Sequence, residues 1–399
     1  MLNTKKIKKL KANIWKLQLY YILWSLMFCT PIIVLFYQDI GLSLAQIMII
    51  QSITSLIFVG LEVPSGYFAD LYGRKNSLLL NAIFAFLAIP IFAISTTFYS
   101  ILLAAILWSI GGVFRSGADS ALLYDTLIQI KEEQNYKKYL GKMVFYYSLG
   151  IAFASLIGGY LGSLNYRYTY WAMLPFIALL IPLSISLTEP VRKKNIFKEG
   201  HFSNILKTLK TQILHNSQFK WIFAYSAIIA GFIRVSFFLY QPYFKLTGLD
   251  IIYFGAIFAT FSIIKALSAK YSHAIEEKLG LKNSLIMIVI FCGTSFILMS
   301  QFIYLLSFIF VFLIQFAHGF STIVISDYIN QETTSEIRAT ILSVQSLIQR
   351  LFFATLTPLI GWIADIYSLE QALLISGIMV IVAGGASLGM LLNSKKQQS

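Results

Sequence analysis

The amino-acid sequence predicts an all-α membrane protein in which twelve transmembrane helices form two pseudo-symmetric bundles of six. Three observations predict this fold class: the composition, the spacing of the apolar runs and an internal repeat. Of the 399 residues, 58% are hydrophobic and only 12% are charged. Soluble domains are typically about 45–50% apolar and about 25% charged, so this chain cannot cover its surface with polar groups in water.

The apolar runs are long enough to cross a bilayer, which takes about 20 helical residues. No small-residue cleavage site follows the first run, so we interpret it as an uncleaved span and not as a signal peptide. We expect twelve spans, at residues 16–37, 44–66, 77–96, 100–122, 143–164, 168–187, 221–242, 251–271, 284–301, 303–325, 342–364 and 371–392.

The distribution of Lys and Arg predicts the orientation of these spans. The net charge is +14, and basic residues gather in alternate gaps, whereas the opposite gaps hold only Arg167 and Lys245. By the positive-inside rule, both termini are cytoplasmic. The surplus charge therefore indicates topology and contact with the lipid bilayer. Nucleic-acid binding is not expected, because no basic groove with stacking aromatic residues is visible.

Two copies of one design follow each other along the chain. GRKNSL at residues 73–78 returns as GLKNSL at 280–285, and IGGYLG at 157–162 returns as IGWIAD at 360–365. A fixed period of this kind indicates duplicated structural units.

The repeat predicts one six-helix bundle in residues 1–187 and a second in residues 220–399, joined by a cytoplasmic linker at 188–219. A helix in the membrane interface and a solvated segment both stay open for the linker. The interfacial helix would present one apolar face, formed by Phe202, Ile205, Leu206, Leu209 and Ile213.

Two six-span halves related by a pseudo-twofold axis are a recurring plan of secondary transporters, which bind a small-molecule substrate between the halves. An enzyme is not expected, since no nucleophile or metal cluster is visible. Cys29 and Cys292 fall in spans of different halves, and the four His are scattered without ligand spacing. We therefore expect no metal, no cofactor and no disulfide.

The loop between the second and third spans reads GYFADLYGRKNS, at residues 66–77. It resembles the signature loop of the major facilitator superfamily, G-x-x-x-D-x-x-G-R-[RK], and the whole chain resembles the twelve-span bacterial drug and metabolite exporters of that family. The resemblance implies the major facilitator fold, the bacterial cytoplasmic (inner) membrane and a functional monomer. The matching residues are Gly66, Asp70, Gly73, Arg74 and Lys75.

Each loop residue has a physical reason. Gly66 would let two helices approach closely, and Gly73 suits a turn. Asp70 can face a helix N-terminus, which the resemblance places at the start of span 11. Arg74 and Lys75 would at the least hold the loop inside.

The resemblance also implies a pair of cytoplasmic latches, one in each repeat. In the first, the basic residue of the loop pairs with Asp125, at the inner end of span 4. Glu277 and Asp327 occupy the equivalent places in the second repeat. Leu281 replaces the arginine there, so we expect the second latch to be weaker.

Ionisable side chains inside a bilayer are expensive and usually functional. The spans contain seven such residues at similar predicted depth, which suggests a shared polar cavity. They are Glu62, Arg115, Asp119, Arg234, Lys265, His318 and Arg350.

Four of these groups carry a fixed positive charge against two acids, and surplus positive charge favours an anionic substrate. Structural ion pairs are the alternative for the arginines, since Arg115 and Asp119 stand four residues apart on one helix face. We assign substrate binding to the basic members of the group, Arg115, Arg234, Arg350, Lys265 and His318.

Coupling requires a group that gains and loses a proton, and Asp119 and Glu62 are the candidates, with Asp119 first. Arg115 and Gly117 resemble the arginine and glycine in span 4 of proton-driven drug exporters, at a shorter spacing. The resemblance implies H⁺ as the coupling ion, and Na⁺ stays open.

Gly158 and Gly159 resemble half of the span 5 motif of drug–proton antiporters, although plain helix packing explains them equally well. Three interpretations stay open. The leading one is proton-coupled export of a small organic molecule, anionic or zwitterionic. The second is import of a metabolite, sugar or siderophore by the same fold. The third is a lipid flippase or a non-transporting membrane scaffold.

Overall fold

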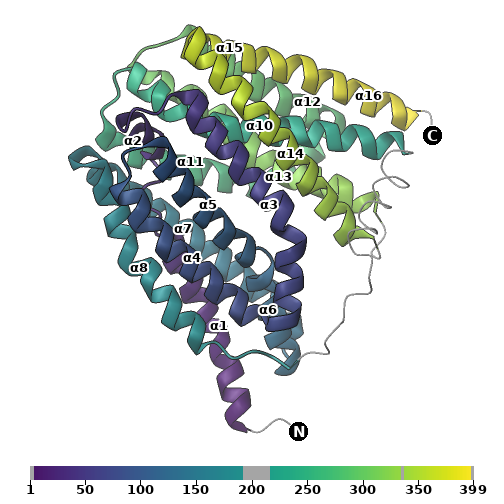
Figure 1. The fold of residues 1–399 in the computed structure, drawn as a ribbon. Helices are drawn as coiled ribbons and strands as arrows, with labels where there is room; N and C mark the ends of the chain where they lie inside the picture. The colour runs from purple at the N-terminus through teal and green to yellow at the C-terminus, as the bar shows by residue number, and fades with distance from the viewer. Residues whose placement is uncertain (1–3, 192–215, 334–336, 397–399) are drawn as a thin grey trace. The chain divides into compact units, whose positions relative to one another are not determined.

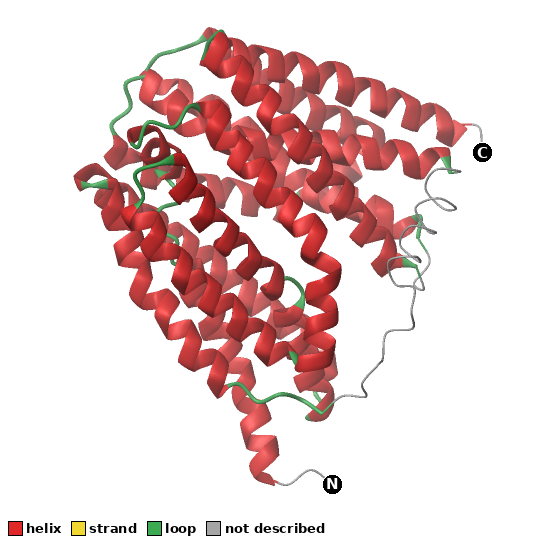
Figure 2. Ribbon diagram, viewed as in Figure 1, coloured by secondary structure: helices red, strands yellow, loops and turns green. Residues whose placement is uncertain are grey.

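The computed structural model describes residues 4–191, 216–333 and 337–396, and this part of the chain is helical with short connections and no strand (Figures 1 and 2). The first repeat holds α1 (Thr4–Ser25), α2 (Ile33–Asp39), α3 (Leu44–Tyr72), α4 (Arg74–Ile94), α5 (Phe98–Arg115), α6 (Ala118–Gln129), α7 (Tyr136–Leu164) and α8 (Tyr166–Ser186).

The second repeat follows residue 216. It holds α10 (Ser217–Leu246), α11 (Ile251–Lys270), α12 (Ser272–Gln301), α13 (Val311–Gln331), α14 (Arg338–Ile366), α15 (Leu369–Met379) and α16 (Gly385–Lys396). A short π-helical segment, Val380–Gly384, joins α15 to α16, and these three together make the last predicted span.

Eleven helical segments of the described residues are long and apolar enough to cross a membrane. The predicted first span, 16–37, is not one continuous helix, because α1 ends at Ser25 and α2 begins only at Ile33. Pro31 lies in this break and has no N–H to donate to a helix. The α1 helix also carries a lysine-rich beginning, so its composition is not that of a span.

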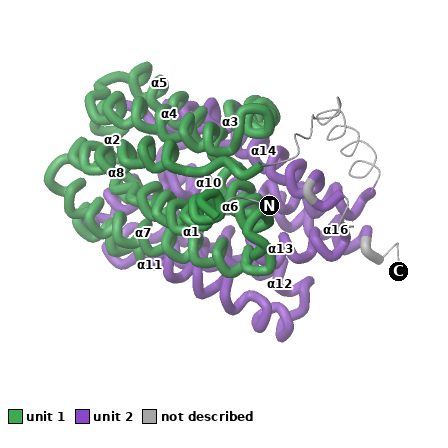
Figure 3. The backbone as a smooth tube through the Cα atoms, turned by 90° about the horizontal axis from the view of Figure 1, so that it is seen from below, with its two compact units in different colours: residues 1–41, 57–199, 251–259 green, residues 42–56, 200–250, 260–399 purple. Residues whose placement is uncertain are grey.

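The chain forms two compact units, drawn in green and purple in Figure 3. Unit 1 contains residues 1–41, 57–199 and 251–259, and unit 2 contains 42–56, 200–250 and 260–399. Each unit thus takes the beginning of one helix from the other repeat. The domain boundaries predicted from the repeat stay a prediction, and the linker face from Phe202 to Ile213 lies outside the described residues.

In unit 1, α7 packs against α1 and the segment after it through small residues. A Cβ atom added at Gly158 would lie 2.0 Å from the carbonyl oxygen of Phe28, and one at Gly159 would lie 2.6 Å from the amide nitrogen of Gly255, at the start of α11. Both glycines of the span 5 motif are therefore needed for close packing of the backbones.

In unit 2, the beginning of α3 is bound to α14. The carboxylate of Asp365 accepts hydrogen bonds from the amides of Leu44 (3.0 Å) and Ala45 (2.9 Å), the first two residues of α3. Further along, the hydroxyls of Ser52 and Ser55 donate to carbonyl oxygens of α14, at 2.6 and 3.0 Å. A carboxylate at a helix N-terminus also offsets the positive end of the helix dipole.

We expect Gly158→Ala to destabilise the protein by about 1–3 kcal/mol, because the added methyl group must displace the backbone at Phe28. Gly141→Ala is the matched control on the same helix, since a Cβ at Gly141 meets nothing within 4 Å. Cys29 and Cys292 are both buried. A thiol-reactive dye therefore reports unfolding as a melting temperature, and equal melting temperatures for the two variants would contradict this packing.

Candidate binding cavity in unit 2 and the charged groups of unit 1

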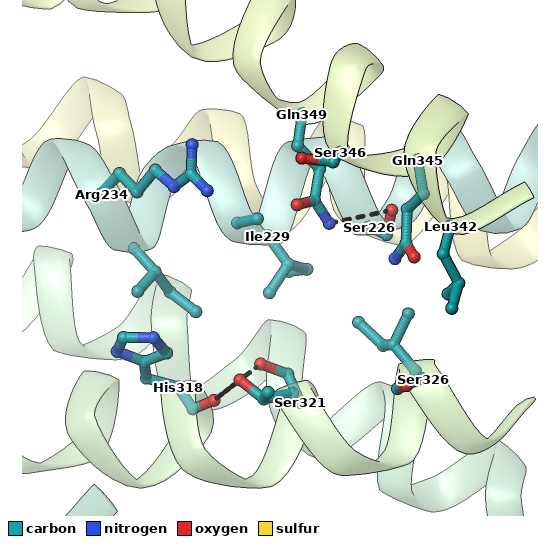
Figure 4. Close-up of a pocket in the computed structure, with 14 residues that line it drawn as sticks. Ser226, Ile229, Arg234, His318, Ser321, Ser326, Leu342, Gln345, Ser346 and Gln349 are labelled. Carbon is teal, nitrogen blue, oxygen red and sulfur yellow. Dashed lines mark hydrogen bonds between the residues drawn. The ribbon is translucent and has the colours of Figure 1, made fainter. Parts of the chain in front are cut away.

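A cavity of about 350 Å³ lies inside unit 2, between α10, α13 and α14. Figure 4 shows Arg234 and His318 together at one end of it, with Gln345, Ser326 and Leu342 toward the other. The lining residues are Ser226, Ile229, Ala230, Ile233, Arg234, His318, Ser321, Thr322, Ile325, Ser326, Leu342, Gln345, Ser346 and Gln349.

The helical period explains why these residues share the cavity. The α10 helix contributes Ser226, then Ile229 and Ala230, then Ile233 and Arg234, which are steps of three and four residues along one face. The α13 helix repeats this spacing from His318 to Ser326, and α14 does so from Leu342 to Gln349. Each helix therefore turns one stripe of mixed polar and apolar side chains toward the cavity.

Arg234 is the single arginine or lysine that lines the cavity, and no Asp or Glu lines it. Its guanidinium lies 5.9 Å from the ring centre of Phe353, within the range of a cation–π contact. No carboxylate of the described residues forms an ion pair with it. The positive charge of Arg234 is thus available to a ligand in the cavity.

Further basic side chains lie near Arg234. Arg350 is close enough to interact with it electrostatically, and His318 lies within electrostatic range of both Arg234 and Lys265. The structure therefore brings together four of the predicted binding residues, Arg234, Lys265, His318 and Arg350, in unit 2. The fixed charges of Arg234 and Arg350 repel each other, which favours a bound anion.

Sequence reasoning missed the uncharged polar lining. Gln345, Ser346 and Gln349 on α14, and Ser226 on α10, have no motif and no charge that marks them. The available signal was the four-residue spacing of two glutamines in an apolar span, which places them on one helix face.

In unit 1, Arg115 and Asp119 lie on either side of a break in the fourth predicted span. The α5 helix ends at Arg115, and α6 begins at Ala118 after Gly117, whose φ of 76° is left-handed. Glycine reaches this conformation without a steric penalty. The break sets the arginine at the negative end of α5 and Asp119 in the first turn of α6, so each charge faces the favourable end of a helix dipole.

Aromatic side chains contact both members of the Arg115–Asp119 pair. Nε of Arg115 lies 3.9 Å from Asp119, which also accepts a hydrogen bond of 2.9 Å from the hydroxyl of Tyr21. The guanidinium lies 4.8 Å from the ring centre of Trp24, which stacks on Trp108 at 4.9 Å. Arg115 is therefore partly compensated within unit 1, in contrast to Arg234.

Glu62 lies on the part of α3 that belongs to unit 1, half-buried and without an ion pair among the described residues. The sequence predicts one cavity shared by all seven charged residues. The structure divides them, with Glu62, Arg115 and Asp119 in unit 1 and the others in unit 2. The shared cavity stays a prediction.

The signature loop of unit 1 is closed by two carboxylates. Arg74 pairs with Asp125 and also donates to the carbonyl of Ala121 at 2.6 Å. Glu189 accepts from the amides of Arg74 (3.0 Å) and Lys75 (2.8 Å) at the start of α4. This Glu189 contact was not predicted, since its residue lies over a hundred positions away in the sequence.

Two further predictions for the loop have clear outcomes. Gly73 adopts a φ of 110°, as its predicted turn requires. The close helix approach predicted at Gly66 is wrong, because a Cβ there meets nothing within 4 Å. The contact of Asp70 with the start of span 11 stays a prediction.

Among the described residues, the loop of the second repeat has the same glycine turn but no salt bridge equivalent to Arg74–Asp125. Gly280 has a φ of 74°, matching Gly73. Asp327 accepts from Gln331 at 2.7 Å, and Glu277 lies 3.9 Å from His273, both exposed. No arginine pairs with either acid among the described residues, so the predicted weakness of this latch agrees with the geometry.

A repeated sequence, apolar helices long enough to cross a membrane and a cavity lined by an arginine side chain are typical of polytopic membrane transporters. The sequence model of the Major Facilitator Superfamily matches residues 19–355, and the chain belongs to this family.

Known proteins share the fold at low identity. The uncharacterized MFS-type transporter YxaM of Bacillus subtilis (strain 168) is 23% identical over 261 residues, 62% of this chain and 63% of that protein, so the match spans less than two thirds of the relative. A point mutant of the nucleoside transporter NupG has a TM-score of 0.82 at 14% identity, over 96% of this chain and 99% of that one. A D-xylose-proton symporter has a TM-score of 0.68 at 15% identity, over 96% and 97%.

The two loops allow a comparison by pseudo-symmetry. We expect Asp125→Asn to lower the free energy of unfolding by about 1–3 kcal/mol, because Arg74 loses its charged partner. Asp327→Asn at the equivalent place should change it by less than about 0.5 kcal/mol, as an exposed substitution does. Melting temperatures by the buried-thiol method decide this, and an equal loss in both variants would contradict the assignment.

Proposed function

We propose that this protein is a secondary active transporter that exports a small organic anion in exchange for protons across a bacterial cytoplasmic membrane. It works by alternating access as a monomer with both termini inside. The observation that carries the proposal is Arg234, a cation without a carboxylate partner in the described residues, in a cavity lined by no acid.

The cavity favours an anion over a lipophilic cation. A cation would meet Arg234 directly and Arg350 within electrostatic range. An anion would form charge-assisted hydrogen bonds with the guanidinium, which are stronger than neutral ones.

We assign the proton-coupling step to Asp119. It is buried, receives a hydrogen bond from Tyr21, and lies at the long distance of 3.9 Å from its arginine. A carboxylate held by a hydrogen bond and a weak ion pair can exchange partners when it takes up a proton. Glu62 is the second candidate, and Na⁺ is the alternative ion.

Export rests on the likeness of span 4 to proton-driven exporters, since the span 5 glycines are accounted for by packing. Import is the second candidate. The uncharged Gln, Ser and Thr lining supports it, because such groups suit hydroxylated solutes, and solved structures of the same fold include a nucleoside transporter and a D-xylose-proton symporter. A flippase or scaffold is disfavoured by Arg234 and by the Gln, Ser and Thr side chains that line the cavity.

Proton flux in proteoliposomes tests the proposal. With an inside-acid gradient, a pH-sensitive dye, and K⁺ with valinomycin to clamp the potential, an exported anion added outside should release internal protons. An imported one should act only when the outside is acid. We expect Asp119→Asn to abolish the response, while Asp39→Asn, an exposed carboxylate in the same unit, leaves it intact. Silence toward every cation, sugar and organic anion by folded protein would refute the proposal.

We expect Arg234→Gln to lower the affinity for the active anion by about tenfold to a hundredfold, which is the range for hydrogen bonds to charged groups. Lys245→Gln is the control, because Lys245 is an exposed cation on the same helix. Unchanged half-saturation of the flux in Arg234→Gln would contradict the assigned role.

We expect Asp70→Asn to impair flux without removing the protein from the membrane, if its carboxylate stabilises one transport state. Rates are compared at equal protein per vesicle. A normal rate in Asp70→Asn would show that this loop acts without the Asp70 charge.

A further inference from the structure

The cavity of unit 2 has two ends of different chemistry (Figure 4). Arg234 and His318 lie at one end, and Ser226, Ser326 and Gln345 lie toward the other. Ser226 and Arg234 stand eight residues apart on α10, which is about 12 Å along a helix that rises 1.5 Å per residue. His318 and Ser326 have the same separation on α13, so the two helices set the same length for the cavity.

The first end is built for one negative charge. A guanidinium presents its N–H groups in a planar fork that matches the two oxygens of a carboxylate. The ring of Phe353 lies against this guanidinium at 5.9 Å and restricts its orientation. Arg234 is the single fixed cation among the lining residues, so the lining offers direct ion pairing to one carboxylate.

The opposite end is built for uncharged polar groups. Gln345 and Gln349 lie one turn apart on α14, and each carboxamide offers both a donor and an acceptor. Gln349 donates to Ser226 at 3.5 Å, which is long for a hydrogen bond, so a ligand hydroxyl or amide can replace it at little cost. The side chain of Gln345 forms no hydrogen bond within the part of the chain that the structure describes.

Aliphatic and polar side chains both line the stretch between the two ends. Ile229 and Ile233 of α10 and Ile325 of α13 lie there, together with Ser321 and Thr322 of α13. The isoleucines favour an aliphatic part in the middle of the ligand, and the two hydroxyls can pair with a polar group there, since burying an unpaired polar group costs free energy. The volume of about 350 Å³ is near the lower end of the range of roughly 300–1,000 Å³ for small-molecule sites.

We infer that this site takes an elongated monocarboxylate whose far end carries hydroxyl or amide groups, with the carboxylate on Arg234 and the polar head on Gln345 and Gln349. The inference rests on the proposed function and narrows its substrate class. It excludes simple fatty acids, which lack the head, and neutral polyols, which lack the charge.

Three soluble probes separate the two ends. Pantothenate has a carboxylate, an amide and hydroxyls, panthenol replaces its carboxylate by an alcohol, and hexanoate has the carboxylate without the head. Titration calorimetry on the full chain in lipid nanodiscs should show pantothenate binding at least about tenfold more tightly than either of the others, since it alone satisfies both ends.

Two variants test which residue binds each end of the ligand. Arg234→Gln should lower the affinity for pantothenate to that for panthenol and leave the affinity for panthenol unchanged. Gln345→Leu should lower the affinity for pantothenate about fivefold, the effect of one neutral hydrogen bond, and leave the affinity for hexanoate unchanged. Lys245→Gln should alter none of the three. Folding of each variant is verified by the buried-thiol melting temperature.

The inference is overturned if folded wild-type protein does not bind pantothenate, or binds hexanoate or panthenol as tightly. It is also overturned if Arg234→Gln lowers the affinity for panthenol as much as the affinity for pantothenate. These binding measurements use no ion gradient. A two-ended binding pattern without proton movement would therefore refute the coupled transport and leave the two-ended site standing.

Discussion

The bilayer requires every backbone N–H and C=O inside it to find a partner within the protein, and this requirement governs where the chain can depart from a helix. The described chain departs from helix inside predicted spans at two clear places. In the first, residues 26–32, tight turns such as the bond from Ile32 to Cys29 (3.0 Å) satisfy part of the backbone. At the second, Ser116 donates back to Gly112 and Val113, both at 3.1 Å. The first break contains Phe28, whose carbonyl packs against Gly158, and the second separates Arg115 from Asp119.

The two repeats differ at the break at Gly117. In unit 1 it separates Arg115 from Asp119 and gives each a helix end of suitable polarity. In the second repeat, Gly319 stands eight residues before Asp327, as Gly117 does before Asp125, and it lies inside a continuous α13. A Cβ at Gly319 would lie 2.1 Å from the carbonyl oxygen of Lys265, so packing against α11 occupies this position. One repeat uses its glycine for a charged pair, and the other uses it for close contact beside a cluster of positive charge.

Composition and periodicity were sufficient to predict most spans, because lipid imposes a long apolar run on each one. The Arg74–Asp125 pair was implied by the resemblance of the loop to the family signature, and the turn at Gly73 followed from the glycine itself. The break of the first span was missed, although Pro31 lies in it, because the apolar run continues on both sides of the proline. The Glu189 cap could not be predicted, because a contact between distant segments leaves no periodic trace in the sequence. The glutamines of α14 were missed although their four-residue spacing places them on one helix face.

The division of α3 has a mechanical consequence. Asp365, Ser52 and Ser55 join the beginning of this helix to α14 at points spread over about 22 Å, or fifteen residues of α14, whereas the remainder of α3 belongs to unit 1. The helix is continuous from Leu44 to Tyr72 and contains Pro64. Any displacement of one unit against the other must therefore flex α3 or detach its beginning from α14. Proline weakens the helix locally, so bending near Pro64 requires less free energy than detaching the beginning of α3. Glu62 lies two residues from Pro64, so its carboxylate would move with the bend.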